Sequence, residues 1–148
     1  MCCDGRVTDP DTDPVVLRAI AERLAAEAAA FVARRRVEVF SDTLTPSVVR
    51  AKSTPTDPVT VVDTETERLL RDRLAELRPG EDILGEEEGG SAAAHDGLTW
   101  VLDPIDGTKS FITGFPLFGT LISLAYQSKP YCGVVDIPAT GERWLGQP

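Results

Sequence analysis

The sequence predicts an α+β domain in which two helices pack on a mainly antiparallel sheet. Apolar residues recur at helical spacing in two early segments, and the later part of the chain holds short apolar runs separated by turn sequences. Helices followed by a run of strands are typical of this fold class. The chain has 148 residues, of which 42% are hydrophobic and 26% charged, so it can form one globular domain with its own core.

The two helices are predicted at 14–39 and 62–77. In the first, apolar residues recur at steps of three, four and seven within an alanine-rich stretch. Prolines, serines and threonines in 42–58 break this helix and indicate a loop or short extended segments. Asp63 and the threonines beside it can cap the second helix, and the Pro-Gly pair at 79–80 ends it.

Five strands follow in the predicted order of elements. They are expected at 82–85, at 99–102 with an end at Asp103, and at 119–126, 130–137 and 143–146. The last three are separated by Gln-Ser-Lys-Pro and Ala-Thr-Gly-Glu, which are turn sequences of hairpin length and predict an antiparallel meander. Acidic residues cluster where the first two strands end.

The charge of the chain restricts its ligands. Lys and Arg number 15 against 24 Asp and Glu, a net charge of −9, which argues against nucleic acid as the main ligand. Fourteen of the acids lie in 57–106, against four arginines. Such a bias is typical of a solvated surface and also of sites for hard divalent cations.

We expect residues 1–13 to be a disordered lead-in and residues 14–148 to form the domain, because 1–13 have little apolar content. This lead-in is acidic, where a signal peptide is basic and then apolar, and no apolar run approaches the roughly 20 residues of a membrane helix. A cytoplasmic protein with no membrane partner is therefore expected. Cys2, Cys3 and Cys132 form no C-x-x-C pair, which predicts free thiols.

Segment 100–108 is the most informative for chemistry. A buried strand delivers Asp103 to its end, and a tight turn then lets Asp103 and Asp106 face the same point, as in a cation site. Gly107 allows close approach of the backbone to a ligand. The N–H groups of Thr108 and its successors, if they begin a short helix, would form a cradle for an anion. The alternative interpretation of residues 103–107, Asp-Pro-Ile-Asp-Gly, is a surface turn in which Asp caps the backbone.

Two other segments are weaker when taken alone. Residues 85–89 place acids directly after a short strand that could lie beside the strand delivering Asp103, so that a carboxylate from each would bracket one or two metals. An acidic triplet between glycines is also typical of a solvated loop. Segment 52–63 has the pattern of a loop and a helix cap, and the lone His95 is expected to be a surface residue.

Together these three segments resemble the inositol monophosphatase family of magnesium-dependent, lithium-sensitive phosphatases. D-P-V-T-x-x-D stands at 57–63, G-E-E at 85–87 and W-x-x-D-P-I-D-G-T at 100–108, at the family's intervals. The resemblance covers nearly the whole chain from Leu17. It implies the N-terminal part of a layered α/β sugar-phosphatase fold.

The resemblance implies a metal role for four residues. Glu86 would ligate a first Mg²⁺ together with Asp103 and the backbone carbonyl of Ile105. Asp103 would bridge to a second Mg²⁺, which Asp106 also binds. The family has two or three such sites, and in this chain the second lacks an aspartate that the family supplies from a Trp-Asp motif.

The resemblance also implies the catalytic and substrate-binding residues. Thr108, oriented by Asp63, would polarise the attacking water, and Glu86 joins this catalytic group through the first metal. The substrate would contact Asp106, Gly107 and Thr108, the last two through backbone N–H groups. Lys52 matches a family lysine near the metal site and is a possible accessory residue.

The implied function is hydrolysis of a small phosphate monoester by metal-activated water, with inositol 1-phosphate as the first substrate. Histidinol phosphate is the alternative, because 107–111 and 141–144 look like the histidinol-phosphatase branch. The stretch before 100–108 looks like actinobacterial inositol-1-phosphatases.

Family members are much longer than this chain, so we expect a truncated domain with little activity. An alternative from a different class of function is a non-catalytic module that binds metal and anions. The strand at 143–146 would expose apolar surface, which favours aggregation or a homo-oligomer.

Overall fold

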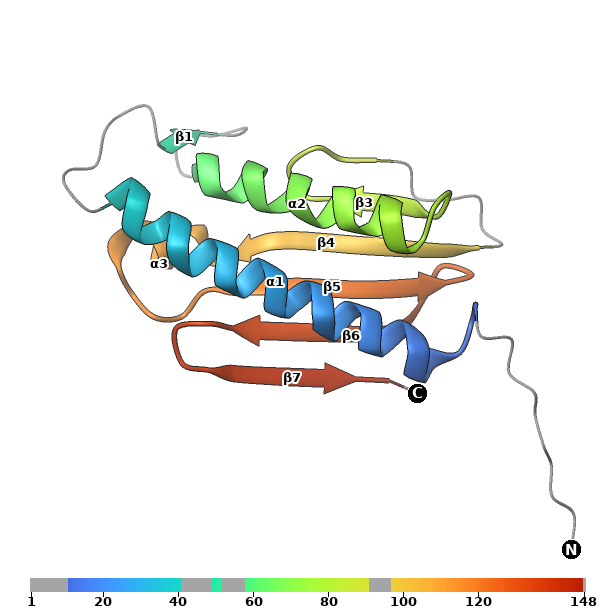
Figure 1. The fold of residues 1–148 in the computed structure, drawn as a ribbon. Helices are drawn as coiled ribbons and strands as arrows, with labels where there is room; N and C mark the ends of the chain where they lie inside the picture. The colour runs from blue at the N-terminus through green and yellow to red at the C-terminus, as the bar shows by residue number, and fades with distance from the viewer. Residues whose placement is uncertain (1–10, 41–48, 52–57, 91–96, 148) are drawn as a thin grey trace, which may run out of the picture.

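The computed structural model describes residues 11–40, 49–51, 58–90 and 97–147. Two long helices lie over one face of the main sheet (Figure 1): α1 spans Pro14–Phe40 and α2 spans Val61–Leu77. The N–H of Val15 donates to the Asp13 carboxylate at 2.8 Å, so Asp13 caps α1 directly before its first-turn proline. Both helices lie where the sequence predicts them.

A capping box begins α2. The Thr60 hydroxyl accepts from the N–H groups of Val62 and Asp63, and the Asp63 carboxylate accepts the Thr60 N–H at 2.8 Å. The helix ends at Leu77, directly before Arg78 and the Pro-Gly pair that the sequence indicated. Local signals therefore account for both ends of α2.

Within the described residues the main sheet holds five strands in sequential order. They are β3 (Asp82–Gly85), β4 (Leu98–Asp106), β5 (Gly119–Tyr126), β6 (Lys129–Ile137) and β7 (Glu142–Gly146). β3 pairs with β4 in parallel, and the other three pairs are antiparallel. The prediction of two helices on a mainly antiparallel sheet is confirmed.

Three short elements complete the described structure. β1 (Val49–Ala51) and β2 (Pro58–Thr60) form a separate antiparallel pair, and α3 (Thr108–Thr113) follows β4. The sequence indicated short extended segments before the second helix, and it allowed for a short helix beginning at Thr108. α3 matters for function because it begins directly after the acidic end of β4.

The expected end of a strand at Asp103 is wrong, because β4 continues to Asp106. Its pairing with β5 passes from Asp103↔Leu121 to Asp106↔Gly119, with an irregularity between them. Pro104 has no N–H to give to a ladder, and a bulge lets the chain pass this residue before pairing resumes. The turn is therefore confined to Gly107, and Asp103 and Asp106 are both strand residues.

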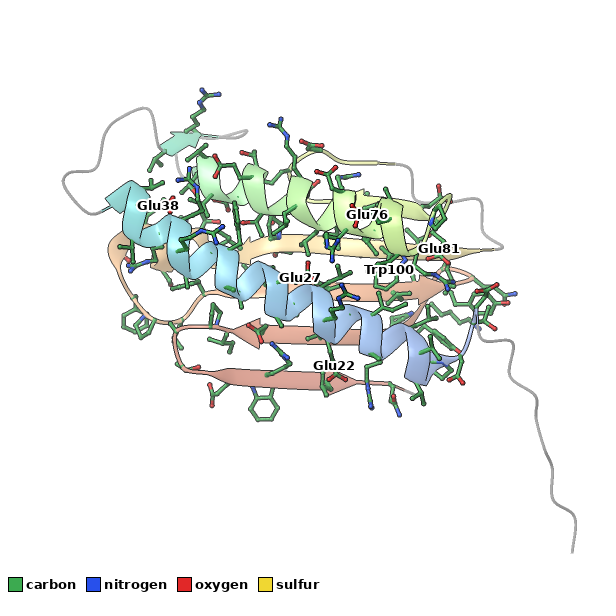
Figure 2. The ribbon with its side chains drawn as sticks, viewed as in Figure 1. Glu22, Glu27, Glu38, Glu76, Glu81 and Trp100 are labelled. Atoms are coloured by element: carbon green, nitrogen blue, oxygen red, sulfur yellow. The ribbon has the colours of Figure 1, made fainter. Side chains whose placement is uncertain are left out.

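The main core lies between the helices and β4 to β6. Trp100 of β4 is fully buried in it, and its indole N–H donates to Glu81 at 2.6 Å (Figure 2). A second cluster of buried residues lies at the other end of β4 and comprises Val32, Val62, Ile105, Phe111 and Phe118. This second cluster supports the segment that passes from β4 into α3.

In the part of the chain that the structure describes, no helix is long and apolar enough to span a membrane. Cys132 is a free, buried thiol, whereas Cys2 and Cys3 lie outside the described residues. The disordered lead-in, the domain boundary at 13/14 and the cytoplasmic location stay predictions.

Candidate active site

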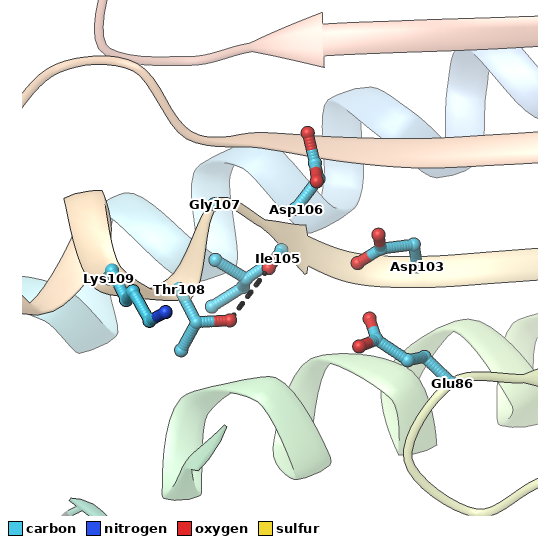
Figure 3. A pocket seen from close by; sticks show the side chains of 7 residues that line it. All are labelled: Glu86, Asp103, Ile105, Asp106, Gly107, Thr108 and Lys109. Carbon is cyan, nitrogen blue, oxygen red and sulfur yellow. Dashed lines mark hydrogen bonds between the residues drawn. The ribbon is translucent and has the colours of Figure 1, made fainter. Parts of the chain in front are cut away.

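A pocket of about 210 Å³ opens at the end of β4 (Figure 3). Its lining residues are Glu86, Asp103, Ile105, Asp106, Gly107, Thr108 and Lys109. Glu86 comes from the loop after β3, and the others come from the end of β4 and the start of α3. Six of the residues expected at the site therefore line a single pocket.

The parallel pairing of β3 and β4 explains how Glu86 reaches this pocket. The carboxyl ends of parallel strands meet at the same edge of a sheet, and Gly85 at the end of β3 pairs with Leu102. The Glu86 N–H donates to the Leu102 carbonyl at 3.0 Å, which continues the ladder one residue beyond β3. Glu86 is thereby placed beside Asp103.

The oxygen donors in the pocket have a definite arrangement. In Figure 3 the carboxylates of Glu86 and Asp103 point toward one another, while that of Asp106 points away from Glu86. Among the described residues no group of three or more acidic, His or Cys side chains is close enough to hold one metal ion. The acids are therefore arranged as a facing pair with a third carboxylate apart.

Gly107 makes the sharp turn from β4 into α3. Its φ of 81° and ψ of 39° are left-handed, and a Cβ at this position would lie 2.9 Å from the Leu117 carbonyl oxygen. Any other residue would be strained in this conformation and would also collide with the backbone of the following loop. The turn places Thr108 at the rim of the pocket, directly after the two aspartates.

Asp63 lies behind Thr108 rather than among the pocket-lining residues. Its side chain is 1% exposed, and one oxygen accepts the Thr108 hydroxyl at 3.2 Å while the other accepts the Thr60 N–H and hydroxyl. Burial raises the pKa of the Asp63 carboxyl, and the hydrogen bonds from Thr60 and Thr108 act in the opposite direction.

The Thr108 hydroxyl lies between two acceptors, because the Ile105 carbonyl oxygen is 3.1 Å from it (Figure 3). A hydroxyl has one proton, so it can donate to Asp63 or to Ile105 but not fully to both. Its lone pairs remain available for a further donor.

Lys109 lines the pocket, although the sequence analysis did not select it as a site residue. It directly follows the Gly-Thr turn, and this position was the signal that could have identified it. Lys52, Asp57 and His95 lie outside the described residues, so the accessory role of Lys52 and the surface position of His95 stay predictions.

A sequence model described as the inositol monophosphatase family matches residues 13–148. The chain belongs to the inositol monophosphatase family. The resemblance inferred from the three motifs is thereby confirmed. Members of this family are metal-dependent and act on small phosphate monoesters.

Individual relatives agree with this assignment. The inositol-1-monophosphatase SuhB of Mycobacterium tuberculosis is 60% identical over 141 residues, which are 90% of this chain and 49% of that protein. The solved structure of M. tuberculosis SuhB gives a TM-score of 0.71 at 46% identity and covers 90% of this chain and 45% of that one.

A histidinol-phosphatase of M. tuberculosis is 46% identical over 87 residues, which are 59% of this chain and 33% of that protein. The chain spans about half the length of the curated inositol-1-monophosphatases that it matches.

Proposed function

We propose that the pocket at the end of β4 is the metal- and phosphate-binding part of a phosphatase for small phosphate monoesters. Inositol 1-phosphate is the first substrate to test. The observation that carries the proposal is the pocket itself, in which Glu86 and Asp103 face one another beside a hydroxyl backed by a buried carboxylate. The relation to proteins named inositol-1-monophosphatase supports this choice of substrate.

The donors in the pocket fit Mg²⁺ by their chemistry, because they are carboxylate and carbonyl oxygens. Glu86, Asp103 and the Ile105 carbonyl would hold one ion, and Asp103 with Asp106 would hold another. The facing carboxylates of Glu86 and Asp103 suit the first ion, whereas the Asp106 carboxylate stands apart from this pair and would have to turn toward Asp103 to hold the second. When bound, the cations neutralise phosphoryl oxygens and lower the pKa of water.

The chain's own groups would orient the reactants. The Thr108 hydroxyl would accept a hydrogen bond from the attacking water while it donates its own hydrogen bond to Asp63, when the Ile105 oxygen is engaged elsewhere. Asp63 thus acts on the water through Thr108. The backbone N–H groups of Gly107 and Thr108 would bind phosphate oxygens, and the Lys109 ammonium adds a positive charge beside them.

Histidinol phosphate is the second candidate substrate. It is favoured by the similarity to a histidinol-phosphatase and by the Gly-Thr-Lys-Ser-Phe sequence at 107–111, which looks like that branch of the family. Parallel rate measurements on the two phosphate esters would decide between them. A preference for inositol 1-phosphate of at least about tenfold in kcat/KM, about 1.4 kcal/mol, would favour the first candidate.

The proposed function is tested by phosphate release from both esters, with Mg²⁺ and after chelation by EDTA. We expect slow Mg²⁺-dependent release, well below the roughly 1–10³ s⁻¹ that is typical of enzymes, because among the described residues two carboxylates, those of Asp103 and Asp106, are assigned to the second ion. The Thr108→Val variant should lower the rate further. Release that persists in EDTA would contradict the proposal, and Mg²⁺ binding without any release would favour the non-catalytic module.

We also propose that β7 takes part in self-association. Trp144 and Leu145 are 64% and 46% exposed, and they line an apolar groove with Val135 of β6. Sedimentation of the chain should show an oligomer or aggregate that the Trp144→Ser variant weakens. A monomer at all concentrations would contradict this proposal.

A further inference from the structure

We propose that Glu67 is a positioning residue that holds the acidic loop 86–88, so that Glu86 faces Asp103. The inference rests on the proposed function, because it assigns a role in cation binding to a residue outside the pocket. Glu67 lies in α2, one turn after Asp63, and is 0% exposed. Both of its carboxylate oxygens accept backbone N–H groups of the loop, which is the bonding of a positioning residue.

The contacts of Glu67 are with the backbone of the loop. One carboxylate oxygen accepts the Glu87 N–H at 2.6 Å, and the other accepts the Glu88 N–H at 3.1 Å. Successive backbone N–H groups that converge on one anion form a strong local binding site for it. The anion here is part of α2, so these bonds fix the loop to the helix.

Arg71, one helical turn after Glu67, completes the attachment. Its guanidinium donates to Glu67 at 2.9 Å and also to the Gly89 carbonyl oxygen. The Gly89 carbonyl in turn accepts the Gly85 N–H at 2.8 Å, which closes the base of the loop. The loop is thus held through its N–H groups by Glu67 and at its base by Arg71. The Arg71 charge also offsets the cost of burying the Glu67 carboxylate.

Gly85 makes this arrangement sterically possible. A Cβ at this position would lie 2.0 Å from a Glu67 carboxylate oxygen and 2.7 Å from an Arg71 nitrogen. The glycine before the acidic triplet therefore provides the space that the Glu67 carboxylate occupies. This requirement is independent of metal binding, since it concerns only the fit of α2 beneath the loop.

The attachment constrains Glu86 from both sides. Its own N–H is bound to the Leu102 carbonyl at 3.0 Å, and the next two residues are bound to Glu67. Three successive glutamates repel one another, and the Glu88 side chain is in addition bonded to Arg68 at 2.6 Å. Because the bonds to Glu67 already order this backbone before a cation binds, less conformational entropy is lost when Glu86 binds the cation.

The test compares Mg²⁺ affinity by calorimetry for the full chain and its Glu67→Gln variant. We expect affinity to fall by about tenfold or more, as for other partners that orient a metal ligand. The matched control is Glu65→Gln, because Glu65 lies in the same helix but is bonded to Arg35 of α1. This control should stay within a factor of about two of the wild type. Unchanged affinity in a folded Glu67→Gln protein would overturn the inference.

A double-mutant cycle separates positioning from a general loss of structure. If Glu67 acts through Glu86, then Glu67→Gln should weaken Mg²⁺ binding no further in a Glu86→Gln background. An equal loss in both backgrounds would overturn the inference. Glu67→Asp keeps the charge at shorter reach and should recover part of the affinity, which provides a second variant if Glu67→Gln does not fold.

Amide hydrogen exchange in the metal-free protein gives a readout that does not depend on the proposed function. The Glu87 and Glu88 amides should exchange faster in Glu67→Gln than in the wild type, while exchange in the β5 core stays unchanged. Unchanged exchange at Glu87 and Glu88 would overturn the inference by itself. Wild-type protein that binds no Mg²⁺ would contradict the proposed function, and the exchange rates would still decide the role of Glu67 in holding the loop.

Discussion

Replacement of Gly85 by alanine tests the close approach between α2 and the acidic loop. The added Cβ would lie 2.0 Å from a Glu67 carboxylate oxygen, whereas real Cβ contacts below 3.0 Å are essentially never seen. The carboxylate or the loop must therefore shift by about an ångström. Glu67 is fully buried and its carboxylate is held by Arg71 at 2.9 Å, and an Arg71 nitrogen would itself lie 2.7 Å from the added Cβ, so the carboxylate has little free space into which to move.

The expected loss of stability follows from the hydrogen bonds that this shift disturbs. Glu67 accepts the Glu87 N–H at 2.6 Å and the Glu88 N–H at 3.1 Å, and a hydrogen bond to a charged group contributes about 1.5–3 kcal/mol net. Loss of one bond and weakening of the other should lower the free energy of unfolding by about 2–4 kcal/mol.

Urea unfolding at pH 7, followed by circular dichroism, measures this change. Gly97→Ala is the matched control, because a Cβ at Gly97 would meet no atom within 4 Å and its φ is not positive. That variant should stay within about 0.5 kcal/mol of the wild type. A free energy of unfolding for Gly85→Ala that is equally close to the wild type would refute the reasoning about the Glu67 carboxylate.

Three further predictions concern buried groups. Burial raises the pKa of Asp63, so its carboxyl favours the folded state below its unfolded pKa of about 3.9, and this contribution is lost as pH rises through the folded pKa. As pH rises from 4 to 7, the free energy of unfolding from urea titrations should therefore fall less in Asp63→Asn than in the wild type. Free energies of unfolding that change with pH by the same amount in both proteins would contradict this prediction. Burial also raises the pKa of the Cys132 thiol, so with Cys2 and Cys3 replaced by serine its alkylation should be at least about 100-fold slower in the folded than in the unfolded protein. Trp100→Phe removes the 2.6 Å bond to Glu81 and leaves core volume unfilled, which should lower the free energy of unfolding by about 2–3 kcal/mol; an unchanged urea midpoint would show that the bond contributes nothing.

The helices were predictable because their signals are local. Asp13 before Pro14 and the Thr60–Asp63 capping box lie within a few residues of the ends that they determine. The meander of β5, β6 and β7 was also predictable, since turn sequences separate its strands. The continuation of β4 past Pro104 was missed, because a bulge depends on the pairing partner Gly119 rather than on local sequence.

In the site, too, features that depend on residues distant in the sequence could not be predicted. The lining of one pocket by Glu86 and Asp103 was foreseeable, because Glu86 directly follows β3 and Asp103 lies near the end of β4, the next strand along the chain. Glu67 was not foreseeable, since an acid within an amphipathic helix has the pattern of a solvated face. Its partners Glu87 and Glu88 lie about 20 residues away in the sequence, and only the packing of α2 against the loop brings them together.

We propose that Asp103 is the main cation ligand of this pocket, and Mg²⁺ titration of the full chain by calorimetry is the measurement that tests this proposal. Asp103→Asn keeps the shape of the side chain and removes its charge, and Asp72→Asn removes an equal charge from an exposed position on α2. We expect Mg²⁺ binding by the wild type and by Asp72→Asn, and a larger loss of Mg²⁺ affinity in Asp103→Asn than in Asp106→Asn, because Asp103 is assigned to both ions. An Mg²⁺ affinity of Asp103→Asn equal to that of the wild type would contradict it.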